Sequence, residues 1–133
     1  MSLELPNLPY AYDALTPYMS AETLELHHDK HHQAYVTNGS ALLDESELKS
    51  ETLENIIISS FDGGNVGPLF NNVAQHWNHI KFWEWMKPNG GGSIPGKLEA
   101  KLSSDFGSVD GFKSAFIQAG ITQFGSGWCW LVL

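Results

Sequence analysis

The sequence predicts a mainly α-helical fold: an N-terminal hairpin of two long antiparallel helices, then shorter helices, then the first strand of a truncated α/β C-terminal domain. Three observations predict it. Apolar and aromatic residues recur at helical spacing in two long segments. A glycine-rich loop over residues 87–92 follows the second segment, and residues 125–133 change to an apolar, aromatic strand pattern. We therefore expect two domains, residues 1–88 and 89–133.

The first long helix is expected to begin after Ser20, because serine is a preferred N-cap and Glu22 favours the positive end of the helix dipole. The helical pattern continues to Asn38-Gly39, a pair expected to end or kink the helix. Before it, residues 4–19 carry three prolines and should form an extended arm.

The remaining elements follow from spacing and turn residues. A shorter helix is predicted over residues 52–60, a loop over 62–67, and the second long helix over 68–86, where Pro68 suits the first helical position. Two short helices are predicted at about 95–105 and 109–122. One isolated strand cannot satisfy its edges, so residues 125–133 are expected to lead into a sheet.

Charge and cysteine content exclude several classes of function. Seven Lys and Arg against 15 Asp and Glu give a net charge of −8, which argues against nucleic acid and anionic membranes as partners. Cys129, the single cysteine, cannot form an intramolecular disulfide or a cysteine zinc site. No stretch has the roughly 18 apolar residues of a membrane span. We expect a soluble, cytoplasmic protein.

Histidines are the strongest chemical signal, because all six lie in two short segments, one in each long helix. Residues four apart share a helix face, so His27, His31 and Tyr35 should lie on one face. In the second helix, Gln75 should lie one turn before His79. Two packed helices can each offer an imidazole to a metal, and imidazole suits iron, manganese, zinc or copper. Spacing alone does not choose among these metals.

Other readings of the same residues are weaker. A histidine pair four apart is most often a solvated helix face, but six histidines in two helices make that reading less favourable. Asp29 follows His28 where a zinc protease needs glutamate. Glu25 precedes His28 at the Glu-x-x-His spacing of di-iron proteins, but no second copy exists.

Four motifs, taken together and in order, resemble the iron/manganese superoxide dismutases. They cover nearly the whole chain: Leu8-Pro9-Tyr10, His27-x3-His31-His32-x2-Tyr35-Val36, Ala74-Gln75-x-Trp77-Asn78-His79-x3-Trp83 and Phe124-Gly125-Ser126-Gly127-Trp128-x-Trp130-Leu131. The resemblance implies an enzyme that converts superoxide to dioxygen and hydrogen peroxide. The cofactor would be one mononuclear iron ion per chain, with manganese as the alternative, in a homodimer or homotetramer.

The resemblance also implies roles for individual residues. His27 and His79 would be metal ligands, whereas Tyr35 and His31 would line the substrate funnel. Gln75 would supply the amide that hydrogen-bonds the metal-bound solvent; this favours iron, because manganese-type members usually have glycine there.

Two expected ligands are missing. The family takes an Asp and a His from an Asp-x-Trp-x-x-His motif, and no such motif occurs before Leu133. Two imidazoles alone should bind iron weakly. The alternative function is therefore an inactive or weakly metal-binding N-terminal fragment that acts as a non-catalytic helical dimerisation module.

Overall fold

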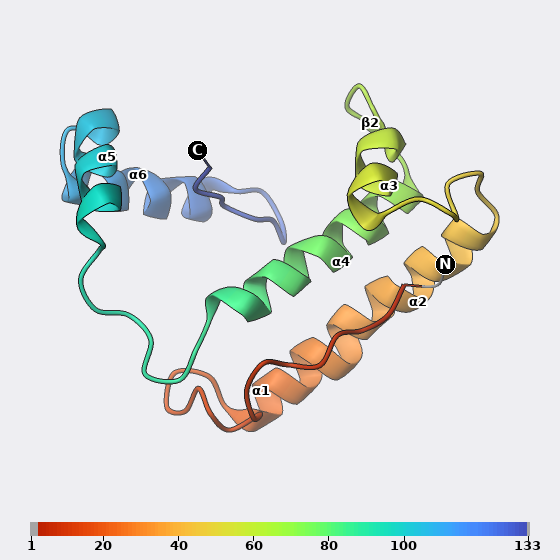
Figure 1. Cartoon of the computed structure of the whole chain (residues 1–133), viewed down its shortest axis with the longest axis horizontal. Coiled ribbons are helices and arrows are strands. Elements are labelled where there is room, and N and C mark those ends of the chain that lie inside the picture. Colours follow the sequence, from red (N-terminus) through yellow and green to blue (C-terminus); the bar gives the residue numbers. More distant parts are fainter. Residues whose placement is uncertain (1–2, 133) are drawn as a thin grey trace. The chain divides into compact units, whose positions relative to one another are not determined.

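The computed structural model describes residues 3–132, and these are mainly helical, which confirms the predicted fold class (Figure 1). The elements in order are α1 (Ala21–Glu25), the π-helix η1 (Leu26–His32), α2 (Gln33–Asp44), α3 (Leu53–Ser60), β1 (Phe61–Asp62), β2 (Asn65–Val66), α4 (Pro68–Trp85), α5 (Gly96–Phe106) and α6 (Val109–Thr122). The chain forms two compact units, Met1–Gly90 and Gly91–Leu133. The predicted division into domains after residue 88 stays a prediction, and its boundary lies in the loop between these units.

The first long helix is continuous from α1 through η1 to α2 and lies antiparallel to α4 (Figure 1). Ser20 caps it as predicted, because its hydroxyl accepts a hydrogen bond from the Thr23 N–H at 3.1 Å. The predicted end at Asn38-Gly39 is wrong, since α2 continues to Asp44. A Cβ on Gly39 would stand 2.8 Å from Leu3 Cδ1, so the glycine admits the N-terminal arm rather than ending the helix.

The N-terminal arm is less extended than predicted. Residues 12–18 form turns, and residues 3–8 run without regular structure. Its first described residue, Leu3, donates its N–H to the Ser40 hydroxyl at 3.1 Å, which holds the arm on α2.

The core of the first unit joins α2, α3 and α4. Leu43, Ile56 and Val73 are each almost fully buried and form one apolar cluster, one residue from each helix. The Thr52 hydroxyl caps α3 by accepting the Asn55 N–H at 3.3 Å. This cluster fixes the far end of the helical hairpin, so the histidine-bearing segments of the two long helices stay opposed.

The segment predicted as a loop over residues 62–67 contains a small antiparallel ribbon instead. Phe61 pairs with Val66, and Asp62 pairs with Asn65. Gly63 and Gly64 join the two strands at φ angles of +56° and +99°, which residues with a Cβ rarely adopt. The two glycines therefore encode a tight hairpin that a reading of the segment as a plain loop did not anticipate.

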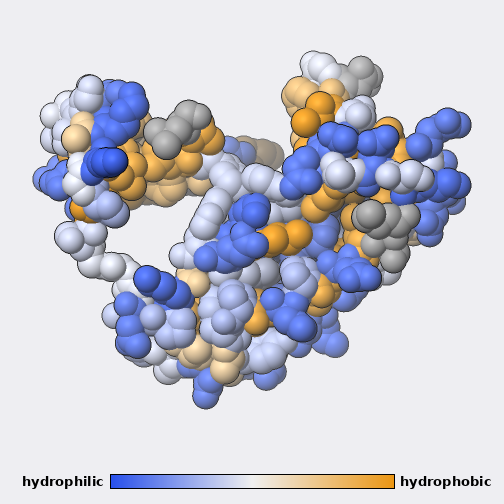
Figure 2. Space-filling view, in the orientation of Figure 1, coloured by the Kyte–Doolittle hydropathy of each residue, from blue (hydrophilic) through white to orange (hydrophobic). Residues whose placement is uncertain are grey.

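The second unit consists of α5 and α6. Gly107 closes α5 in a left-handed conformation, and the Ser108 hydroxyl caps α6 by accepting the Gly111 N–H at 2.9 Å. No α6 residue is buried, and the apolar side chains of Ile117 and Ile121 are exposed. Figure 2 shows hydrophobic surface over the part of the chain where Figure 1 labels α5 and α6. The strand predicted from residue 125 is absent among residues 125–132, because no other described segment pairs with it. Within the part of the chain that the structure describes, no helix is long and apolar enough to cross a bilayer.

Candidate metal centre

The antiparallel packing of η1 on α4 brings His27 and His79 together. Their Nε2 atoms lie 3.0 Å apart, although the residues are 52 positions apart in the sequence. His79 is 2% exposed and His27 is half-buried. The two residues predicted as ligands thus present one ring nitrogen each to the same point.

The backbone fixes which nitrogen of His79 carries the proton. His79 Nδ1 lies 2.7 Å from the Gln75 carbonyl oxygen, which can only accept a hydrogen bond. The proton of the neutral ring is therefore on Nδ1, and Nε2 directs a lone pair toward His27. Burial lowers the pKa of His79 to about 4, which keeps the ring neutral near pH 7. A neutral imidazole held in this way is the form that binds a metal.

His31 adds a third imidazole from the solvent side. One ring nitrogen from each of His27, His31 and His79 can be chosen so that all three lie within 4.8 Å of one another. His31 is exposed, and with Thr23, Leu26 and His27 it lines a shallow hollow open to solvent. Burial, and next the neighbouring His31, lower the pKa of His27. Sequence reasoning placed His31 in the substrate funnel, and the geometry adds that it is close enough to share the ligand cluster.

Tyr35 lies between this surface and the buried ring of His79. Its ring centroid is 5.0 Å from that of His31 and 5.4 Å from that of His79. Tyr35 thus lies beside His31, with which it was predicted to share a helix face, and also beside His79. Its chemical role stays a prediction.

Gln75 contacts His79 through its backbone carbonyl and not through its side chain. Its carbonyl oxygen accepts the His79 Nδ1–H, so the residue orients the proposed ligand through the backbone. Any residue type has this carbonyl, so no sequence signal could have revealed the contact. The predicted role of the Gln75 amide stays a prediction.

A buried layer of polar rings lies behind the ligand pair, and the motifs assigned its histidines no role. His32 is fully buried, receives the Trp83 Nε1–H at 3.0 Å and lies 2.8 Å from His76 Nδ1. Its ring stacks on that of His79, with centroids 5.0 Å apart and planes 23° apart. The available signal was the antiparallel register, since His32 is five residues after His27 and His76 is three before His79.

The π-helix explains how His27 and His32 both face α4. At about 100° per residue, positions five apart on an α-helix point roughly 140° away from each other. The Gln33 N–H instead reaches the His28 carbonyl, five residues back, as in a π-helical turn. The widened turn brings His32 back toward the side of His27, which an analysis based on α-helical spacing could not predict. π-Helical turns of this kind occur frequently at functional sites.

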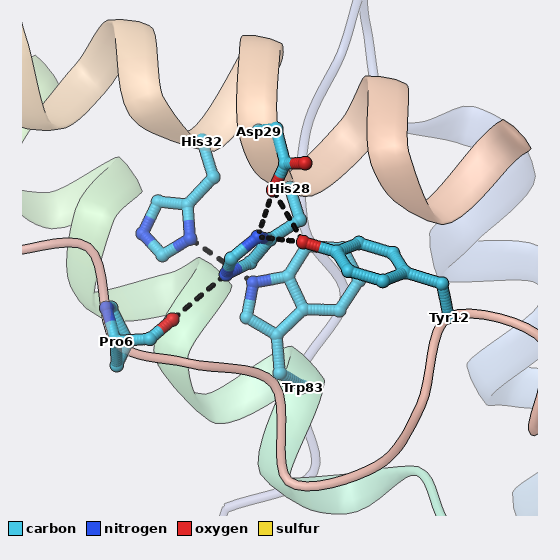
Figure 3. A network of polar contacts seen from close by, with 6 residues as sticks. All are labelled: Pro6, Tyr12, His28, Asp29, His32 and Trp83. Atoms are coloured by element: carbon cyan, nitrogen blue, oxygen red, sulfur yellow. Dashed lines mark hydrogen bonds and ion pairs between the residues drawn. The ribbon is translucent and has the colours of Figure 1, made fainter. Parts of the chain in front are cut away.

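Another polar network ties the arm to η1 (Figure 3). The Tyr12 hydroxyl donates to Asp29 Oδ1 at 2.7 Å, and the same oxygen lies 2.6 Å from His28 Nδ1. His28 Nε2 reaches the Pro6 carbonyl at 2.8 Å. The Tyr12 hydrogen bond, followed by that from His28, holds the pKa of Asp29 below its ordinary value. These contacts fasten the arm across η1.

Comparison with known protein families agrees with this arrangement. Residues 2–87 match the family model for the iron/manganese superoxide dismutase alpha-hairpin domain, and residues 94–133 match the model for the C-terminal domain of the same family. The chain belongs to the iron/manganese superoxide dismutase family. The resemblance predicted from the four motifs is confirmed.

Some relatives of this chain are named for manganese and others for iron. Superoxide dismutase [Mn] of Rhizobium meliloti (strain 1021) is 60% identical over 132 residues, which cover 98% of this chain and 65% of that protein. Superoxide dismutase [Fe] of Synechocystis sp. is 51% identical over 133 residues, covering 100% and 67%. Superoxide dismutase [Fe] of Escherichia coli (strain K12) is 51% identical over 132 residues, covering 99% and 66%. The chain thus spans about two thirds of the length of these relatives, and family membership implies iron or manganese without choosing between them.

Proposed function

We propose that the protein to which this chain belongs is a superoxide dismutase in which His27 and His79 hold one iron or manganese ion. The observation that carries the proposal is the 3.0 Å approach of the two Nε2 atoms in a chain of this family. The reaction takes two superoxide anions and two protons to one dioxygen and one hydrogen peroxide. In the family pattern, an aspartate and a further histidine complete the ligand set, and their motif does not occur in this sequence.

The histidines fit such an ion chemically. Two nitrogens bound to one ion at about 2.1 Å and at a right angle lie about 3.0 Å apart. The His79 ring is neutral and directs its Nε2 lone pair toward His27, and burial lowers the pKa of His27 as well. Neutral imidazoles are required, because a protonated ring nitrogen cannot bind a metal. The bound metal supplies the one-electron oxidation and reduction that the reaction needs.

The remaining residues of the site position the ligands and move protons. The Gln75 carbonyl keeps His79 in one tautomer, and the rings of Trp83 and His27 pack edge-to-face with centroids 5.0 Å apart. Peroxide formation consumes two protons, and the route from solvent runs past exposed His31 to the Tyr35 phenol. The shallow hollow at His27 and His31 is the entrance for the small anion.

Iron is the metal that we propose, with manganese as the alternative. Gln75 supports iron through the resemblance, whereas the relative that is 60% identical is named for manganese. The homodimer or homotetramer and the cytoplasmic location are proposed on the same resemblance.

Metal content and activity of the full-length protein test this function together. We expect about one iron or manganese ion per chain by mass spectrometry, and loss of both metal and superoxide consumption in His79→Ala, because the mutation removes a ligand. Lys81→Ala, at a partly exposed side chain that pairs with Glu84 on the same helix, serves as the control and should keep both. If His79→Ala keeps its metal and its activity, the ligand assignment is wrong. A non-catalytic dimerisation module would hold no tightly bound metal in the wild type.

A further inference from the structure

Both ring nitrogens of the buried His32 have polar partners on α4. The Trp83 Nε1–H points at His32 Nδ1 across 3.0 Å, as Figure 3 shows, and His32 Nε2 lies 2.8 Å from His76 Nδ1. His32, His76 and Trp83 are 0%, 3% and 2% exposed. A buried polar chain of this kind costs free energy when any partner is lost, because water cannot replace it.

Donor capacity fixes the direction of each bond. An indole N–H can only donate, so His32 Nδ1 accepts. The proton of the neutral His32 ring is then on Nε2, which donates to His76 Nδ1. Two bonds at opposite edges of the ring therefore hold the plane of His32, since a flipped ring would put carbon atoms opposite one or both partners.

The two proposed ligands pack against this hydrogen-bonded chain. The His32 ring lies on that of His79 in a stacked arrangement, and the Trp83 ring meets that of His27 edge-on at 75°. His79 already has one fixed contact at Nδ1, to the Gln75 carbonyl. The stacking partner restricts the remaining freedom of the ring, which is tilting about that hydrogen bond.

We propose that His76 is a positioning residue for the metal centre: it accepts the His32 Nε2–H, fixes the plane of the His32 ring, and thereby sets the orientation of His79 toward the metal. The inference rests on the proposed function, in which His27 and His79 hold the ion. Its consequence is that metal affinity and reduction potential depend on a hydrogen-bond acceptor at position 76, and not only on a side chain that fills the space.

A pair of substitutions at position 76 separates these two requirements. In the full-length, metal-loaded protein, His76→Leu fills the volume without an acceptor, whereas His76→Asn keeps an acceptor oxygen near the place of Nδ1. Val73→Ala is the control, because it removes buried volume from the same helix within the Leu43, Ile56 and Val73 cluster. The readouts are the metal dissociation constant by chelator competition, the reduction potential and the thermal midpoint.

We expect His76→Leu to weaken metal binding by about 10-fold or more, in the range found when partners of ligands are removed, and to shift the potential. His76→Asn should recover most of the affinity. Val73→Ala should lower the thermal midpoint and leave the metal dissociation constant unchanged. If His76→Leu binds metal as the wild type does, or if the Leu and Asn variants lose affinity equally, the positioning role is wrong.

A measurement on the wild type covers the case in which His76→Leu does not fold. Nitrogen-15 NMR of the full-length protein loaded with diamagnetic Zn²⁺ should find protons on Nε2 of both His32 and His76 and none on their Nδ1 atoms. A proton on His32 Nδ1 would overturn the proposal. Failure of the proposed function is a different result: the wild type holds no metal, or His79→Ala keeps it.

Discussion

At the scale of single residues, the site depends on where ring protons and hydroxyl groups lie. The Tyr35 hydroxyl is the group that we expect to transfer protons, because the Tyr35 ring approaches both exposed His31 and buried His79. If the phenol passes protons inward and binds no metal, its removal should affect turnover and spare the metal.

Tyr35→Phe should therefore keep the full metal content and lower the maximal rate of superoxide consumption by about 10-fold or more, as expected for loss of a proton-transfer group. Stopped-flow kinetics and metal analysis on one preparation measure both. Tyr18→Phe removes the same hydroxyl from a side chain that is 95% exposed and should change neither quantity. An unchanged maximal rate in Tyr35→Phe would exclude the phenol from the proton route.

Three of the four buried histidines make the metal-free protein sensitive to acid. Burial lowers the pKa of His32 to about 3 and those of His76 and His79 to about 4, all below the ordinary 6.5. The folded state thus binds fewer protons than the unfolded state below about pH 6.5, and its free energy of unfolding falls as pH falls toward 4.

Urea unfolding of the metal-free protein should give a midpoint that is constant from pH 8 to pH 7 and falls between pH 6.5 and 4. Asp29 adds a separate loss of stability at lower pH. Because the pKa of Asp29 is lowered in the folded state, this loss sets in only as the pH falls to the ordinary carboxyl value of 3.8 and below. A midpoint that stays flat down to pH 5 would contradict the burial of these rings as neutral groups.

At the scale of elements, Gly39 shows how tertiary contact overrides a local signal. Glycine inside a helix costs about 1 kcal/mol relative to alanine, so Asn38-Gly39 reads as a helix end. The helix continues because the missing Cβ leaves room for Leu3 of the arm.

A double-mutant cycle tests that reason. Gly39→Ala alone should gain little or no stability, because its Cβ displaces Leu3, whereas in a Leu3→Ala background it should stabilise by about 1 kcal/mol. Chemical denaturation of the wild type, the two single variants and the double variant gives the coupling free energy between positions 3 and 39. Equal effects of Gly39→Ala in both backgrounds would show that Leu3 does not explain the glycine.

The sequence was sufficient for most of the helices, because caps and spacing are local signals. Only the resemblance implied that His27 and His79 lie together, and their role as ligands stays a prediction. The sequence was insufficient for the π-helical turn, which depends on how η1 packs against α4 and has no periodicity of its own in seven residues. The contact of His79 with the Gln75 carbonyl was equally hidden, since backbone atoms carry no sequence signal.

At the scale of the whole molecule, the first unit contains both proposed ligands and the residues that orient them. Its apolar cluster and its polar rings consist of residues of this unit alone, whereas Leu102 is the one buried residue of α5 and α6. The geometry of His27 and His79 is therefore a property of the helical hairpin.

The net charge of the chain affects how an anionic substrate would approach the proposed site. The chain carries −8 and superoxide is an anion, so the average field of the protein opposes approach. Under the proposed function, attraction must come from close to the site: from the metal that His27 and His79 would hold and from Lys30, which is exposed on η1 between His27 and His31. Such attraction is screened by salt, because the Debye length is only about 8 Å at physiological ionic strength.

We therefore expect the second-order rate constant for superoxide to fall as ionic strength rises. Lys30→Gln should lower the rate at low salt and flatten this dependence, because it removes the local positive charge and leaves the repulsion. Lys87→Gln makes the same change in net charge in the loop after α4 and should retain the wild-type slope. A rate that rises with salt in the wild type would mean that the charge of the whole molecule, and not the field at the hollow, controls the approach of the substrate.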